Sequence, residues 1–161
     1  LCLGISVAGA QKYGHMNFGN LVAMMPETEA ADEKLATFQE DLIKQGEEMA
    51  AAFQEEYAAF VVAVQDGEVP PKDQQSRQQA LQKKQQEIVA FEQQIRQQVQ
   101  QKQEELLAPI VERAQKAVDE VAKENGYVMI FDTSVFNAVL FAQDSDDVMP
   151  MVKAKLGIAE E

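Results

Sequence analysis

The sequence predicts a mainly helical α+β protein, in which a long antiparallel helical hairpin projects from a small β-sheet body built from both chain ends. Apolar residues recur every three or four positions in two stretches within residues 30–110, which is the period of an α-helix. A break containing Gly67 and Pro70-Pro71 separates the stretches at residues 65–72 and lets the chain reverse there. Short β-rich runs occur near both ends of the chain, so the body is expected to draw on both.

Each arm of the expected hairpin has one apolar row. The row of the first arm is Phe38, Leu42, Met49, Phe53, Tyr57, Phe60 and Val64, with Gly46 in the gap. The row of the second arm is Ile88, Phe91, Ile95, Val99, Leu106 and Ile110, with Lys102 at one position of the row. Both rows repeat after eleven residues, which predicts nearly straight arms or a faint right-handed winding. A narrow row needs a partner, so the arms are expected to pack together as a coiled-coil tentacle.

The charge is unevenly distributed along the chain. The net charge of the 161 residues is −13, which argues against nucleic acid as a partner because phosphate binding depends on Lys and Arg. Residues 27–66 carry eleven acidic and two basic side chains, whereas residues 72–105 carry five acidic and six basic ones. We expect the opposed charges to hold the arms together modestly and in a salt-dependent way.

The first ten residues have the composition of the end of a signal peptide. They are apolar, and Ala8-Gly9-Ala10 fits the small-x-small pattern of a signal-peptidase site, so we expect export to the periplasm with cleavage after Ala10. The alternative is a disordered N-terminus or an edge strand. Cleavage would remove Cys2, the one cysteine, and with it any thiol chemistry. No stretch approaches 18 consecutive apolar residues, so no transmembrane helix is expected.

The body is expected to contain residues 11–29 and 111–161. We predict a strand at 13–18, a helical turn at 20–25, and a first long helix that begins after Pro26. The second arm is expected to kink near Pro109 and to end at Asn125-Gly126. Strands are predicted at 127–132 and 138–142, followed by a capping segment at 144–147 and a short helix that Gly157 ends. A sheet of about three strands is marginal alone, so the body is expected to oligomerise.

These segments, in this order, resemble the OmpH/Skp-like periplasmic chaperones. The resemblance rests on Met16 to Leu21, Leu107 to Ile110, Asn125 to Tyr127, Ile130 to Asp132, Asp146 to Val148, and Val152 to Gly157. It implies a homotrimer whose bodies form a β core and whose three hairpins surround a cavity. It also implies an ATP-independent holdase that keeps unfolded outer-membrane proteins soluble. The best-known members are basic, so the acidic charge of this chain leaves its choice of clients and any membrane-surface contact open.

The residues favour no catalytic or metal-binding constellation. His15 has no His or Cys nearby and is better explained as a packed or hydrogen-bonded side chain. No Gly precedes Lys-Ser or Lys-Thr, so a P-loop is absent. The acidic segment 144–147 lacks the Gly and the distal Glu of a calcium loop. We therefore expect neither an enzyme nor a bound metal or cofactor.

Two sets of apolar residues are the candidate binding surfaces. The candidate client-binding set on the first arm is Met49, Phe53, Tyr57, Phe60, Val61 and Val62. Met49, Phe53, Tyr57 and Phe60 are better explained as hairpin core, but Val61, Val62 and Ala63 widen the apolar surface beyond a seam near the tip, so some of it is expected to stay exposed. The candidate trimer-body set is Met16, Phe18, Met129, Phe131, Val139 and Phe141. The rival hypothesis to the chaperone is a structural coiled-coil scaffold or spacer that binds one folded partner in the envelope.

Overall fold

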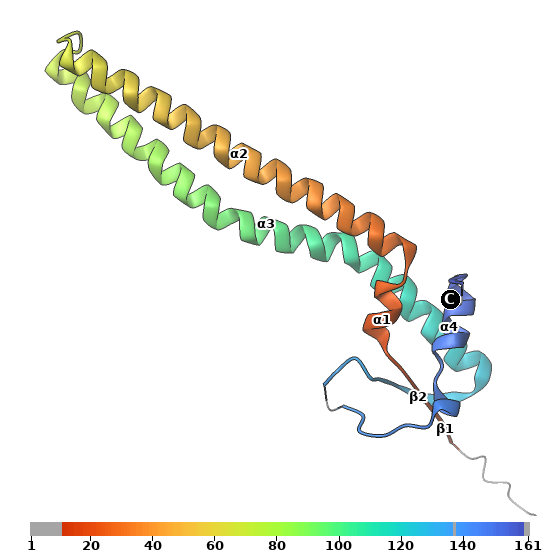
Figure 1. Ribbon diagram of the computed structural model, residues 1–161. Coiled ribbons are helices and arrows are strands. Elements are labelled where there is room, and N and C mark those ends of the chain that lie inside the picture. Colours follow the sequence, from red (N-terminus) through yellow and green to blue (C-terminus); the bar gives the residue numbers. More distant parts are fainter. Residues whose placement is uncertain (1–10, 137, 160–161) are drawn as a thin grey trace, which may run out of the picture. The chain divides into compact units, whose positions relative to one another are not determined.

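The computed structural model describes residues 11–136 and 138–159, so the expected signal-peptide remnant lies outside the described residues. The chain is mainly helical, as predicted (Figure 1). Its elements are β1 (Lys12–Met16), α1 (Phe18–Ala23), α2 (Pro26–Gln65), α3 (Pro71–Asn125), β2 (Tyr127–Asp132), the 3-10 turn η1 (Asp144–Asp146) and α4 (Met149–Leu156).

The described chain forms two compact units. The helix-pair unit is Ala31–Leu106 and contains most of α2 and the first part of α3. The end unit contains residues 11–30 and 107–159 of the described chain, and therefore both strands, α1, α4 and the last part of α3. Helix α3 is thus shared by the two units, with Pro109 inside the helix.

The sheet of the end unit is a two-stranded parallel pair. β1 pairs with β2 in a register that places Lys12 opposite Tyr127 and Met16 opposite Asp132. A parallel pair needs a crossover connection, which here consists of α1, α2 and α3. His15 adds a third segment, because its backbone oxygen accepts a hydrogen bond from the Val148 nitrogen at 2.9 Å. The two strands thus bring both ends of the chain into one unit.

The predicted strand at 138–142 was wrong. Residues 138–142 are irregular. Among the described residues, the sheet has two strands instead of about three. Residues 138–142 pair with neither strand, although β2 keeps one free edge among the described residues. The other edge of β1 is used by the bridge from His15 to Asp147 and by the Val148 nitrogen. High β-propensity alone does not make a strand without a partner backbone.

The first strand is shorter than predicted, and the first helix starts earlier. β1 ends at Met16, and Phe18 is the first residue of α1 rather than the end of the strand. Asn17 is the N-cap of α1, since its side-chain oxygen accepts a hydrogen bond from the Asn20 nitrogen at 2.8 Å. The Phe18 nitrogen donates to Asp132 Oδ1 at 3.0 Å. The start of α1 is therefore attached to the end of β2.

The core of the end unit consists of side chains from four segments. The buried residues are Met16, Leu21, Met25, Ile110, Ala114, Ala117, Val118, Val121, Val148 and Val152. Those of α3 recur every three or four positions and form one face of the helix. The small residues Ala114 and Ala117 allow neighbouring backbone to approach this face closely. The N-terminal segment, α3 and α4 thus share one apolar interior.

Helix α4 begins and ends close to the positions that the sequence indicated. The segment 144–147 forms a 3-10 turn, and the Asp147 carboxylate accepts a hydrogen bond from the Met149 nitrogen at 2.8 Å. Gly157 ends α4 in a left-handed conformation with φ of 73°. Lys155 contacts Glu124 at 2.6 Å and Glu120 at 3.2 Å, and these hydrogen bonds raise the pKa of Lys155. α4 is thereby paired with the last turns of α3.

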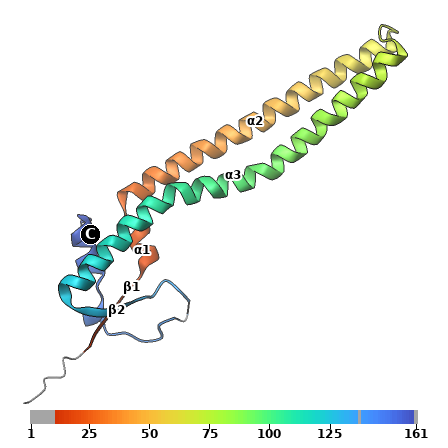
Figure 2. The same cartoon turned by 180° about the vertical axis from the view of Figure 1, so that it is seen from behind.

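In the helix-pair unit, α2 and α3 lie side by side (Figures 1 and 2). α2 ends at Gln65 and α3 begins at Pro71, so the break falls where the sequence placed it. Near the break, Glu56 is paired with Lys84, whereas Lys102 lies over the ring of Phe38 far from it. Residues late in α2 thus lie beside residues early in α3, and residues early in α2 lie beside later ones in α3. The two helices are therefore antiparallel within this unit.

The sheet leaves no room for a side chain at Gly14. A Cβ at Gly14 would lie 2.8 Å from Val148 Cγ1 and 3.0 Å from Tyr127 Cε1. We expect Gly14→Ala to lower the free energy of unfolding by about 1–3 kcal/mol through overpacking. Gly19→Ala is the matched control, because its Cβ would meet Ser134 at 3.4 Å and Ala favours the helix. Urea unfolding followed by circular dichroism checks both, and equal stability of the two variants would contradict the packing argument.

The Asp132 carboxylate generates a prediction about pH. Burial raises its pKa, but hydrogen bonds from the Ser134 nitrogen, the Ser134 hydroxyl and the Phe18 nitrogen together hold the pKa below its ordinary value. The stabilisation is therefore present above the unfolded pKa, about 3.9, and is lost as the pH falls through the folded pKa. We expect wild-type protein to lose more unfolding free energy between pH 6 and pH 3 than Asp132→Asn. Equal losses in the two proteins would show that Asp132 is not a stabilising carboxylate.

Candidate functional site

The helix-pair unit has a thin apolar interior. Leu42, Val69 and Leu81 are its well-buried large side chains among the described residues. Gly46 contributes no side chain, and the ring of Phe91 occupies the space opposite, 3.5 Å from where a Cβ would be. Lys102 occupies one position of the apolar row, with its ammonium 6.0 Å from the Phe38 ring centroid. The rows predicted from the sequence therefore meet, but they remain partly accessible to solvent.

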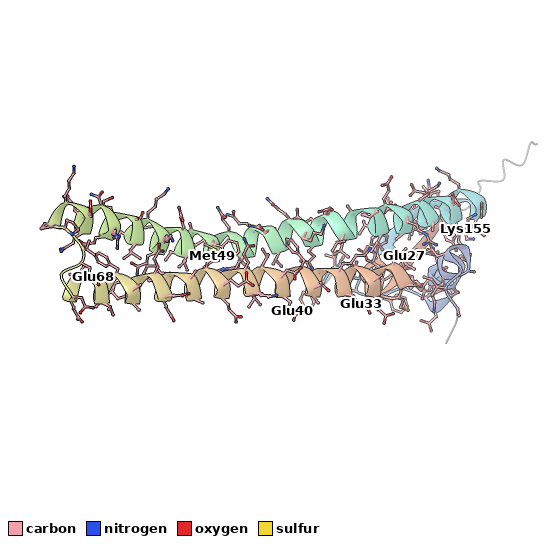
Figure 3. All side chains as sticks on the ribbon, turned by 90° about the horizontal axis from the view of Figure 1, so that it is seen from above. Glu27, Glu33, Glu40, Met49, Glu68 and Lys155 are labelled. Carbon is pink, nitrogen blue, oxygen red and sulfur yellow. The ribbon has the colours of Figure 1, made fainter. Side chains whose placement is uncertain are left out.

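The six candidate client-binding residues divide into two groups. Met49, Phe53 and Phe60 of the first apolar row are half-buried, as is Val61 beside the row. Tyr57 and Val62 are 52% and 55% exposed, and the Tyr57 ring stacks on Phe53 with 6.1 Å between centroids. Figure 3 shows Met49 between the two helices and Glu33 and Glu40 on the outer side of α2. The set is thus divided between the seam and the surface.

The outer side of α2 is acidic. Among the described residues, the ion pairs of this unit are Lys84 with Glu56, Lys83 with Glu87 at 3.6 Å, and Lys102 with Glu105 at 3.0 Å. Only the first joins the two helices, so cross-helix pairing compensates little of the α2 charge. Exposed pairs of this kind contribute less than about 1 kcal/mol each. The unit therefore depends on its apolar row rather than on opposite charges.

The six candidate trimer-body residues also differ in exposure. Met16 is buried in the core of the end unit, and Phe18 and Val139 are half-buried. Met129 and Phe131 on β2 are exposed, and Phe141 is 83% exposed. The sequence reasoning missed Phe136 and Leu140, which are even more exposed than Phe141. Phe136 lies outside the predicted strands, and Leu140 falls on the face opposite Val139 and Phe141 in the predicted strand 138–142, so neither was chosen.

A shallow cavity lies in the end unit beside β1. It has a volume of about 470 Å³ and is lined by Tyr13, His15 and Phe131 together with residues 138–142. His15 Nε2 lies 2.9 Å from the Gln143 carbonyl oxygen. The His15 side chain thus contacts the end of the irregular segment at Gln143, and its backbone oxygen accepts the hydrogen bond from Val148. Both contacts give His15 a structural role. Phe131 of β2 and Leu140 and Phe141 of the irregular segment are exposed side chains that also line this cavity.

Sequence reasoning also missed two exposed aliphatic residues of the helix-pair unit. Ile43 and Val89 are 56% and 50% exposed. Each directly follows a residue of an apolar row, Leu42 and Ile88, so counting the rows drew attention to the preceding residue. A check of which apolar residues fall outside the rows would have found them.

The possible metal ligands of the described residues lie apart from one another. No three His, Cys, Asp or Glu side chains in residues 11–136 and 138–159 come together in a metal-binding arrangement. In the same ranges, no helix has the length and apolar character needed to cross a membrane.

The fold defines a class of protein in which one unit is a pair of long antiparallel helices and the other contains a parallel strand pair from distant parts of the chain. The family described as outer membrane protein (OmpH-like) matches residues 12–156, and the chain belongs to this family. A crystal structure from Caulobacter crescentus CB15, described as a candidate OmpH-like outer membrane chaperone, has the same fold with a TM-score of 0.74. It is 15% identical, and the match covers 96% of this chain and 89% of that chain. No curated protein matches the chain.

The gap at Gly46 generates a prediction about the helix pair. An added Cβ would contact the Phe91 ring at 3.5 Å and 3.7 Å, which is ordinary van der Waals separation. Ala also loses less backbone entropy than Gly in a helix, so we expect Gly46→Ala to stabilise the protein by about 1 kcal/mol. Thermal unfolding followed by circular dichroism at 222 nm checks this. A lower midpoint would mean that the two helices pack more tightly at this position than described.

Proposed function

We propose that the protein is an ATP-independent holdase chaperone of the periplasm, which binds unfolded outer-membrane proteins and prevents their aggregation. Membership of the OmpH-like family supports a chaperone role. The description of the similar Caulobacter crescentus structure as an outer membrane chaperone supports the same class of client. The residues 1–10 of the sequence support export, with cleavage after Ala10.

The observation that carries the proposal is the incomplete burial of the apolar residues in the helix-pair unit. Phe53, Phe60 and Val61 are half-buried, and Tyr57 and Val62 are more than half exposed. A helix pair that served only as a spacer would gain stability by enclosing these side chains. Weak and non-directional apolar contacts suit a holdase, because they hold many unfolded sequences without selecting one. Met49 adds a flexible side chain of the kind found at permissive binding surfaces.

The proposal includes a homotrimer assembled through the end unit, with the helix pairs as hairpin arms that enclose the client. The exposed apolar side chains Met129, Phe131 and Phe141 support such an interface, since a monomer would leave them in water. Strand β2 has one neighbour among the described residues and so offers an edge to a second chain. Enclosure by three arms would let individually weak contacts act together.

An aggregation assay tests the proposal. An unfolded eight-stranded outer-membrane β-barrel protein is diluted from urea with and without the full chain, without ATP, and light scattering is followed. We expect scattering to fall in proportion to added protein and to reach its minimum near one trimer per client. Multi-angle light scattering in the same buffer should give the mass of three chains.

The matched control uses a folded soluble protein of similar size instead of the unfolded client, and no complex is expected. Unchanged scattering in the presence of a stable trimer would overturn the holdase and favour the scaffold that binds one folded partner. A monomer that still suppresses scattering would overturn the enclosure mechanism while retaining the chaperone.

A further inference from the structure

Two hollows on the helix-pair unit are lined largely by uncharged side chains. The first lies on α3 and is formed by Gln82, Gln85, Gln86, Val89, Ala90 and Gln93. The second spans both helices, with Gln39 and Ile43 from α2 and Arg96, Val99 and Gln100 among those from α3. The aliphatic side chains Ile43 and Val89 are each about half exposed. Each hollow therefore combines glutamine amides with an accessible aliphatic side chain.

Helical geometry places the exposed aliphatic residues on one side of the pair. Ile43 directly follows Leu42 of the first row, and Val89 directly follows Ile88 of the second. One residue along a helix corresponds to a rotation of about 100°. Because the helices are antiparallel, the same rotation on each leads to the same side of the pair. The second hollow, which takes residues from both helices, lies on this side.

The two sides of the pair differ in charge. In the helix-pair unit, three of the residues that directly follow a row position, with Gly46 counted in the first row, are charged: Glu47, Glu92 and Arg96. Residues that directly precede the members include five carboxylates: Asp41, Glu48, Glu56, Glu87 and Glu105. We call the first side the glutamine side, defined by Gln39, Ile43, Gln82, Val89, Arg96 and Gln100. It is nearly neutral on a chain whose net charge is −13.

The chemistry of the glutamine side fits an extended and uncharged polypeptide segment. A glutamine amide offers both donors and an acceptor, which match the free N–H and C=O groups of an extended backbone. A folded helix would have satisfied these groups internally. Strands of an outer-membrane barrel alternate apolar and polar residues, so an unfolded strand offers apolar side chains at intervals. Ile43 and Val89, with Val99 at the base of the second hollow, provide apolar contacts for them.

We infer that the glutamine side is the surface that binds an unfolded strand segment of the client, with Ile43 and Val89 as its apolar anchors. This inference rests on the proposed holdase function and names its binding surface. The near neutrality of this side matches strand segments that carry few charges, whereas the other side carries five carboxylates, of which three pair with lysines. The half-buried row residues such as Phe53 hold the two helices together, and their exposed parts remain available to the client.

The double variant Ile43→Gln/Val89→Gln tests the inference. Gln is a good helix former and both positions are exposed, so circular dichroism is expected to match wild type. We expect the affinity for the unfolded β-barrel protein, measured by fluorescence anisotropy of a labelled client, to fall about ten-fold. The control variant Ala52→Gln/Ala80→Gln changes two exposed alanines. Ala52 directly precedes Phe53, and Ala80 directly precedes the buried Leu81, so both lie away from the glutamine side. This variant should bind the client like wild type.

A labelling experiment locates the contact independently. The sequence contains one cysteine, Cys2, so the full chain with Cys2→Ser accepts a single new cysteine at a chosen position. Ile43→Cys or Val89→Cys is labelled with an environment-sensitive dye, and Ala52→Cys is the control. Client addition should shift the dye emission to the blue at the first two positions and leave the third unchanged.

The outcomes separate this inference from the proposed function. If wild-type protein does not suppress aggregation, the proposed function fails, and the inference fails with it. If wild type binds the client and the double variant binds equally well, the inference alone is overturned. It is also overturned if the dye at Ile43 shifts with protein concentration in the absence of client, because the occupant would then be a second copy of this chain.

Discussion

A single five-residue strand connects the parts of the end unit. β1 pairs with β2 on one edge, and on the other its His15 oxygen accepts the Val148 nitrogen. Gly14, in the middle of the strand, lies so close to Val148 and Tyr127 that no side chain fits. The strand thus joins three segments that are far apart in the sequence. Without it, α1 and α4 would each have only a few buried side chains to hold them against α3.

The helix-pair unit follows a different physical rule. It has no sheet and little buried apolar surface, and it persists because the two helices are long and their rows coincide over many turns. Gly46 and Lys102 each interrupt the row, one by lacking a side chain and the other by its charge. A polar residue in such a row costs stability but favours one register over its neighbours. Modest packing along the length leaves side chains available for contacts outside the chain.

Much of the architecture could be predicted from residues whose chemistry acts locally. The spacing of Phe38, Leu42 and Met49 indicates a helix regardless of context, and Gly157 ends a helix because it accepts a positive φ. The prediction of a strand at 138–142 failed because a strand is defined by its partner, and this run pairs with neither strand of the described sheet.

The candidate site could be predicted only in part, for a related reason. Periodicity finds the residues that face the other helix, and Met49 is among them. Periodicity does not predict the exposure of Ile43, because that exposure depends on how much of the α2 surface is covered by α3. Surface properties such as the charge difference between the two sides arise from both helices together, so one helix read alone does not reveal them.

The parallel pairing of β1 with β2 also sets an order of events during synthesis. β1 leaves the ribosome first, and its partner follows only after both long helices, since residue 12 pairs with residue 127. Contacts between residues so distant in sequence form slowly, whereas helices form locally and fast. The nascent chain therefore carries complete helices while the first strand still has a free edge. A nascent chain of this architecture therefore passes through a stage in which its own first strand is exposed to pairing with other chains.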